Sequence, residues 1–177
     1  LIFQVVRHCV ERYGQAEVEH WYWELWNEPD IFYWRGTPEQ FDALYDVTVA
    51  AAVRALPTIM VGGPSVTGGP NAVRFMEGFL AHCAGEGDRG TNTVTGGRGT
   101  RLDFISCHTK GSAFGRRSGP LADTGAIHDW GGDAHGNGAV RTPRQSPSRR
   151  KMLTEIRAHL RAAAKHPQFR DLPVIVD

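Results

Sequence analysis

The stretch Trp21-Tyr22-Trp23-Glu24-Leu25-Trp26-Asn27-Glu28-Pro29-Asp30 decides the fold class of this chain. It is an aromatic run that ends at a proline, and proline has no N–H to donate to a sheet, so a strand over residues 21–26 must end there. The preceding residues 2–13 have apolar side chains at helical spacing, and Gly14 follows them. The sequence therefore predicts a helix and then a strand, with Glu28 at the carboxyl tip of that strand.

The same alternation of helix and strand continues to the end of the chain. Thr37-Pro38-Glu39-Gln40 supplies an N-cap, a proline at the first helical position and a capping-box glutamine, so a helix is expected from there to about Leu56. Apolar patterns then predict a strand at 59–61 that runs into Gly62-Gly63-Pro64, a helix around 73–80 and a strand at 102–107. A last helix is expected to start at Ser146-Pro147 and to carry an apolar stripe as far as Ala163, before a strand from 174. Residues 84–100 and 112–145 read as loops.

This order of elements favours a parallel sheet, because parallel strands need crossover helices between them. A barrel and a doubly wound sheet both fit the pattern, but no G-x-G-x-x-G follows a strand, which favours the barrel. A complete (β/α)8 barrel has eight strands and typically about 250 residues. The predicted fold class is therefore α/β, a partial (β/α)8 TIM barrel with residues 1–177 forming about strands 4 to 7 of a single barrel.

The composition limits the classes of partner. Of the 177 residues 41% are hydrophobic and 22% charged, and the net charge of +1 provides no field for nucleic acid or an anionic membrane. No apolar stretch approaches the roughly 20 residues that span a bilayer. The three cysteines form no C-x-x-C pair and are expected to be buried small side chains. Compartment and oligomeric state stay open.

The side chains at the strand tips are the candidates for chemistry, since a barrel places its catalytic groups there. These are Asn27 and Glu28, residues 62–65, and His108 with Lys110. A carboxyl group beside aromatic surface can have its pKa raised by desolvation, which suits a proton donor. Aromatic rings crowd the same region, Trp34 among them, although strand alternation assigns about half of them to the core. The alternative is a strand-ending turn with a solvated glutamate.

Together these motifs resemble glycoside hydrolase family 39, which contains β-xylosidases and α-L-iduronidases. The resemblance is carried by residues 24–30, Tyr45-Asp46, Val61-Gly62-Gly63-Pro64, Gly90-Thr91-Asn92, Leu102–Ser106, His108-x-Lys110-Gly111 and Pro173-Val174-Ile175, in the order of that family. It covers nearly the whole chain except the loop at 112–145.

The resemblance implies a retaining glycosidase with Glu28 as its general acid/base and Asn27, His108, Lys110 and Trp34 in contact with the sugar. The family's nucleophile is a glutamate at the tip of the seventh strand, which this resemblance predicts directly after Asp177. Two such carboxyl groups would lie about 5 Å apart. The expected partner is an oligosaccharide or glycoside, with no cofactor and no metal. The 177 residues alone are expected to be inactive.

The residues after Glu28 favour the β-xylosidase branch. An α-L-iduronidase would be expected to have a histidine two or three positions later, where Asp30 and Ile31 stand. The alternatives are an α-L-iduronidase-like enzyme and a noncatalytic carbohydrate-binding homologue. His128, Asp129, Asp133 and His135 have metal-binding side chains, but their spacing matches no known site, so a solvated or substrate-facing loop is predicted.

Overall fold

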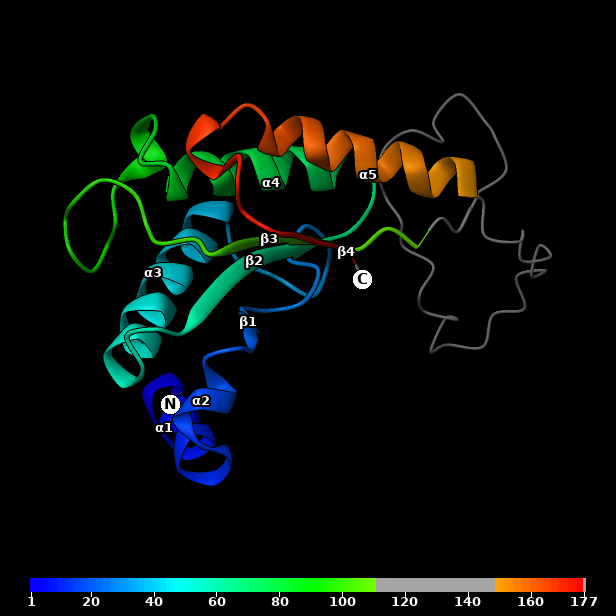
Figure 1. Ribbon diagram of the computed structural model, residues 1–177. Helices are drawn as coiled ribbons and strands as arrows, with labels where there is room; N and C mark the ends of the chain where they lie inside the picture. The colour runs from blue at the N-terminus through cyan, green and yellow to red at the C-terminus, as the bar shows by residue number, and fades with distance from the viewer. Residues whose placement is uncertain (111–148, 177) are drawn as a thin grey trace, which may run out of the picture.

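The computed structural model describes residues 1–110 and 149–176 (Figure 1). Four parallel strands form one sheet in the order β1-β2-β3-β4. The elements in chain order are α1 (Ile2–Tyr13), α2 (Gln15–Val18), β1 (Tyr22–Glu24), α3 (Pro38–Ala55), β2 (Met60–Val66), α4 (Pro70–Cys83), η1 (Asp88–Gly90), β3 (Phe104–Cys107), α5 (Arg149–Ala163), η2 (Pro167–Phe169) and β4 (Val174–Val176).

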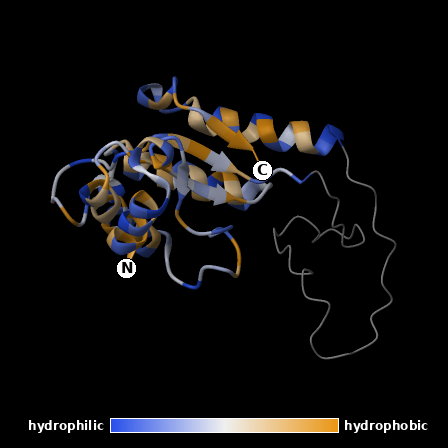
Figure 2. Ribbon diagram, turned by 60° about the horizontal axis from the view of Figure 1, so that its bottom comes forward, coloured by the Kyte–Doolittle hydropathy of each residue, from blue (hydrophilic) through white to orange (hydrophobic). Residues whose placement is uncertain are grey.

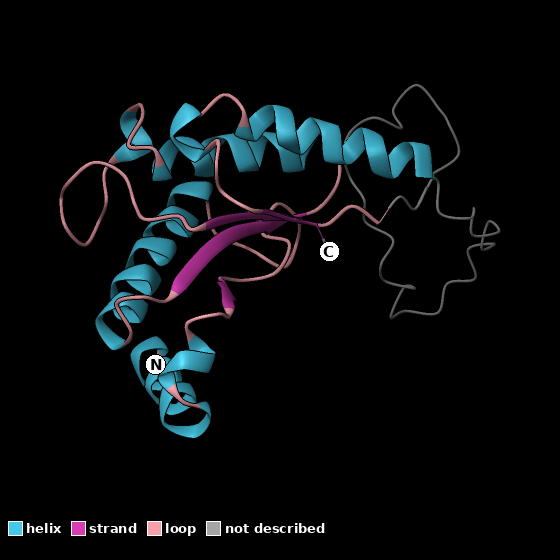
Figure 3. Ribbon diagram, viewed as in Figure 1, coloured by secondary structure: helices cyan, strands magenta, loops and turns pink. Residues whose placement is uncertain are grey.

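The strand order distinguishes the two folds that fitted the sequence. A doubly wound sheet reverses its strand order at a switch point, whereas neighbouring strands in a barrel follow one another along the chain. Here the order is consecutive, and helices α1, α3, α4 and α5 contact one another in chain order as a single layer beside the sheet (Figure 3). The prediction of a partial (β/α)8 barrel is confirmed.

Local sequence signals explain the best-predicted helix, α3. The Thr37 hydroxyl accepts from the Gln40 backbone N–H at 3.2 Å, and the Gln40 side chain accepts from the Thr37 N–H at 2.8 Å, which is the predicted capping box. Phe41 and Tyr45 on this helix are fully buried against Phe79 of α4. Hydrophilic and hydrophobic residues alternate along the helices (Figure 2), and the buried apolar side chains of helices and strands form one core cluster.

Two strands, β1 and β2, end at other residues than predicted. The strand expected over residues 21–26 ends its ladder at Glu24, because Trp26 adopts a left-handed φ of 68° that extended pairing does not allow. The strand expected at 59–61 instead runs to Val66, through the Gly62-Gly63-Pro64 segment that was expected to follow it. An added Cβ at Gly62 would lie 2.4 Å from the Phe104 carbonyl oxygen, so only glycine lets β2 and β3 pair here.

The cysteines, the length of the helices and the loop at 112–145 were also subjects of prediction. Cys83 and Cys107 are buried as expected, while Cys9 is only partly buried. None of the helices within residues 1–110 and 149–176 has the length and apolar character to cross a membrane. The loop at 112–145, with His128, Asp129, Asp133 and His135, lies outside the described residues, as do Gly111 and Asp177.

Candidate active site

Glu28 lies in an irregular segment after β1 that is attached to the neighbouring strand. Its φ is 48°, and its N–H donates to the Ser65 carbonyl oxygen on β2 at 2.9 Å. The prediction of a strand-tip position was therefore inexact: Glu28 follows the last paired residue of β1, Glu24, by four positions. The hydrogen bond to Ser65 nevertheless holds it at the carboxyl edge of the sheet, where a barrel places its catalytic groups.

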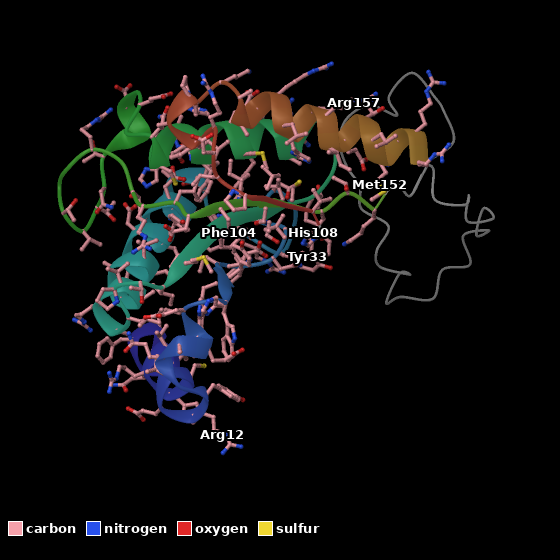
Figure 4. The ribbon with its side chains drawn as sticks, in the orientation of Figure 1. Arg12, Tyr33, Phe104, His108, Met152 and Arg157 are labelled. Carbon is pink, nitrogen blue, oxygen red and sulfur yellow. The ribbon has the colours of Figure 1, made fainter. Side chains whose placement is uncertain are left out.

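Two side chains that follow β3 converge on the Glu28 carboxylate. His108 Nδ1 and Lys110 Nζ each lie 2.7 Å from Glu28 Oε1. Glu28 is 4% exposed, whereas Lys110 is about half exposed. Within the described residues, no hydrogen bond reaches Glu28 Oε2, so that oxygen is open to another partner. His108 and Tyr33 both lie at this end of the sheet (Figure 4). The structure thus brings together three of the residues that the sequence singled out.

The charge state of Glu28 differs from the expectation. Burial raises its pKa, as predicted, but the hydrogen bonds and charges of Lys110 and His108 outweigh burial, so the pKa lies below its usual value near 4.5. The expectation of a raised pKa is therefore wrong for the described residues, because it considered the aromatic surroundings and not the two donors. Glu28 is an ionised carboxylate here.

Asp30, two residues further on, has the opposite shift. Burial raises its pKa, the hydrogen bonds from Thr67 oppose this, and the charge of Glu28 adds to the rise. Thr67 donates to Asp30 through its backbone N–H at 2.9 Å and its hydroxyl at 2.5 Å. These bonds tie Asp30 to the residue that follows β2, and the Glu28 N–H is bonded to Ser65 of the same strand. The segment that carries Glu28 is therefore attached to β2 at two points.

Ser65 was among the strand-tip candidates at residues 62–65, but no particular role was predicted for it. It is fully buried, and its hydroxyl lies 3.0 Å from His108 Nε2. Its place among residues 62–65 at a strand end was the only signal available, because its orientation depends on a left-handed φ of 56° that serine rarely adopts.

The aromatic residues divide into exposed and packed rings. The Trp34 indole N–H donates to the Thr37 carbonyl at 3.0 Å, and its ring packs edge-on against Phe41, so Trp34 is part of the support for this loop. Trp26, Phe32 and Tyr33 are each more than 40% exposed. Asn27 is exposed as well. Sugar contact by Asn27 and Trp34 stays a prediction, and the exposed rings are the more accessible stacking surfaces.

Metal ligation has no candidate in the described part of the chain. There, no three histidine, cysteine, aspartate or glutamate side chains are grouped as a metal ion would require.

The Glu28 carboxylate, in contact with His108 and Lys110, thus lies at the carboxyl edge of a parallel sheet, where (β/α)8-barrel enzymes place their catalytic groups. The comparison with known sequences specifies the family. Residues 1–119 match glycosyl hydrolases family 39, and the chain belongs to this family.

Curated relatives come from two branches of the family. The chain is 36% identical to a beta-xylosidase of Geobacillus stearothermophilus over 110 residues, which are 61% of this chain and 19% of the relative. It is also 36% identical to the alpha-L-iduronidase of Homo sapiens over 116 residues, 63% of this chain and 17% of the relative. The chain therefore spans about a fifth of the length of these relatives.

Solved structures agree on the fold. A monomeric beta-xylosidase from Caulobacter crescentus superposes with a TM-score of 0.66 and 26% identity, covering 98% of this chain and 28% of that one. A bacterial orthologue of human alpha-L-iduronidase superposes with a TM-score of 0.64 and 24% identity, covering 98% and 23%. The agreement extends over both described parts of the chain.

Proposed function

We propose that this chain supplies the general acid/base of a retaining, β-xylosidase-like glycoside hydrolase, and that Glu28 is that residue. The observation that carries the proposal is the convergence of His108 and Lys110 on Glu28 Oε1 while Oε2 stays open among the described residues. An oxygen in this position can exchange a proton with a glycosidic oxygen. Membership of family 39 and the resemblance to β-xylosidases support the same assignment.

The proposed mechanism needs a second carboxylate. β4 ends at Val176, and the nucleophile is expected from the residue that follows Asp177, about 5 Å from Glu28. Because like charges raise each other's pKa, an ionised nucleophile there would counteract Lys110 and His108 and raise the pKa of Glu28. Glu28 would then be protonated for the first step. Formation of the glycosyl intermediate would remove the negative charge, and Glu28 would become the base for the second step.

The position of Lys110 bears on the choice of sugar. A lysine in a sugar site can pair with a uronic acid, donate to hydroxyl groups or stand beside a catalytic carboxylate. Its contact with Glu28 favours the third role, which requires no acidic substrate. The β-xylosidase-like assignment is therefore preferred. An α-L-iduronidase-like enzyme is the second candidate, because the human alpha-L-iduronidase and the Geobacillus stearothermophilus beta-xylosidase have the same sequence identity to this chain, 36%.

The test is Glu28→Gln in the full-length protein that contains this chain. Only substrates with poor leaving groups need a proton at departure, so hydrolysis of an unactivated disaccharide should fall by about 10²–10⁴-fold while the first step on an activated aryl glycoside is spared. Unchanged hydrolysis of the disaccharide would exclude Glu28 as the acid/base.

Two further measurements separate the alternatives. In a panel of aryl glycosides, turnover of the iduronide with none of the xyloside would replace the β-xylosidase assignment by the iduronidase one. If the residue encoded after Asp177 were neither glutamate nor aspartate, a noncatalytic carbohydrate-binding homologue would be favoured instead.

A further inference from the structure

Ser65 occupies an unusual position in β2. Pro64 pairs with Ser106 and Val66 pairs with Cys107, so Ser65 is an additional residue between two paired positions, a β-bulge. Bulges of this kind redirect a side chain, and the φ of 56° at Ser65 is a conformation that costs a non-glycine residue energy. Residues in such strained conformations cluster at functional sites, where their contacts hold them in place.

The contacts of Ser65 reach the Glu28 carboxylate by two routes. Its carbonyl oxygen accepts from the Glu28 N–H at 2.9 Å, which fixes the backbone of Glu28. Its hydroxyl lies 3.0 Å from Nε2 of His108, whose Nδ1 lies 2.7 Å from Glu28 Oε1. Its own N–H donates to the Ser106 hydroxyl at 3.0 Å, so Ser65 is itself anchored to β3.

The hydroxyl suits this place because it can both donate and accept. When Nδ1 of His108 carries a proton and donates to ionised Glu28, the bare Nε2 can accept from the Ser65 hydroxyl. When Nε2 carries the proton, the same hydroxyl can accept from it, and Nδ1 can accept from protonated Glu28. His108 is 9% exposed, so water cannot readily replace this partner. The ring therefore keeps both hydrogen bonds in either tautomer.

We propose that Ser65 is a positioning residue, which acts through His108 to hold the Glu28 carboxylate in place in both protonation states of the reaction cycle. This inference rests on the proposed role of Glu28 and adds a fourth residue to the site formed by Glu28, His108 and Lys110. The other titratable groups around the carboxylate within the described residues are Lys110 after β3 and Asp30 in its own loop, and His159 of α5 interacts with Asp30.

The test compares Ser65→Ala with Ser65→Gly in the full-length protein. Both variants lack the hydroxyl, but glycine tolerates a φ of 56° and alanine does not, so their stabilities should differ. If the hydroxyl matters, both variants should lose about tenfold in kcat/KM on poor leaving groups and much less on activated ones. If Ser65 were purely structural, its substitution would lower kcat/KM equally for both kinds of substrate, and mainly in the less stable variant.

The pH profile provides the second readout. A loosened His108 ring donates less well to ionised Glu28, and this hydrogen bond lowers the pKa of Glu28, so the pKa should rise. The basic limb of the pH profile of kcat/KM should then shift to higher pH, by about half a pH unit to one pH unit, in both variants. Unmoved limbs and equal losses on both substrates would overturn the role of Ser65.

The two proposals fail in different ways. If Glu28→Gln shows the leaving-group dependence and the Ser65 variants do not, only the inference on Ser65 is overturned. If Glu28→Gln hydrolyses the disaccharide normally, the acid/base assignment fails and the role of Ser65 fails with it.

Discussion

Two buried carboxylates in this molecule each contact a histidine, and they differ in what else they contact. Glu28 lies 2.7 Å from His108 at the carboxyl edge of the sheet, and Asp46 of α3 lies 2.8 Å from His82 of α4. Each carboxylate is at most 4% exposed. A buried carboxylate–histidine pair is therefore not by itself evidence of a catalytic site.

The hydrogen bonds of Asp46 are complete. Besides His82, its oxygens accept from the Asn92 amide, the Thr100 hydroxyl and both the N–H and hydroxyl of Thr93. Asn92, Thr93 and Thr100 lie in the loop before β3, whereas Asp46 and His82 lie on α3 and α4. The Asp46 cluster (Asp46, His82, Asn92, Thr93 and Thr100) therefore binds that loop to the helices. The Glu28 cluster (Glu28, Ser65, His108 and Lys110) leaves Oε2 open among the described residues. We therefore propose that the Asp46 carboxylate stabilises the fold, whereas the Glu28 carboxylate has an oxygen that can contact a substrate.

The largest effect is expected for the 177-residue chain on its own. In the proposed mechanism the nucleophile is expected after Asp177, and loss of a nucleophile typically costs about 10⁴–10⁶-fold in rate. We expect no measurable turnover of an activated aryl xyloside by the purified chain, with a Glu28→Ala chain as the control for contaminants. Turnover that depended on Glu28 would mean that the chain contains a nucleophile of its own, with Asp177 as the first candidate.

Removal of Asp46 should mainly affect stability. Asp46→Ala leaves His82, Asn92 and Thr100 without their shared acceptor, and breaking a buried pair of this kind typically costs about 3–5 kcal/mol. Chemical denaturation measures the change. Glu11→Ala, which removes only an exposed ion pair with Arg7, should cost less than about 0.5 kcal/mol. Similar losses for the two variants would contradict a structural role for the Asp46 cluster.

Glu28→Gln should change the stability less than Asp46→Ala does, with a defined pH dependence. Because the pKa of folded Glu28 is lowered, its ionised form stabilises the fold above its usual value near 4.5, and this contribution is lost as the pH falls through the folded value. The variant should therefore be less stable at pH 7 by no more than about 1 kcal/mol, since Lys110 is half exposed. The difference should disappear in acid. A difference that grew below pH 4 would reverse the sign and contradict the assignment of an ionised Glu28.

The sequence predicted those features that depend on neighbouring residues. The capping box at Thr37 and Gln40 lies within four residues, so the start of α3 was located correctly. Parallel strands bring their carboxyl ends to one edge, so Glu28 and His108 could be expected to meet although 80 positions separate them. The end of β1 was missed because the left-handed φ of Trp26 has no sequence signal when glycine is absent.

Features that depend on tertiary contacts were missed. Residues 46 and 92 are part of the motifs that resemble the family, but nothing in the sequence shows that they share one buried hydrogen-bond network. The predicted rise in the pKa of Glu28 was wrong because two donors more than 75 residues away in the sequence lower it. Ser65 was among the strand-tip candidates, but its contact with His108 was not predicted, because the bulge in β2 is a property of its pairing with β3.

The most direct test of the central claim is azide rescue of Glu28→Ala in the full-length protein with an activated aryl β-xyloside. If Glu28 is the acid/base of a retaining enzyme, the variant forms the glycosyl intermediate but lacks the base that activates water, and azide can attack without such help. The account predicts that azide accelerates turnover and that the product is β-xylosyl azide, with the configuration of the substrate retained. An unaltered rate with no azide adduct, or an adduct of α configuration, would contradict it.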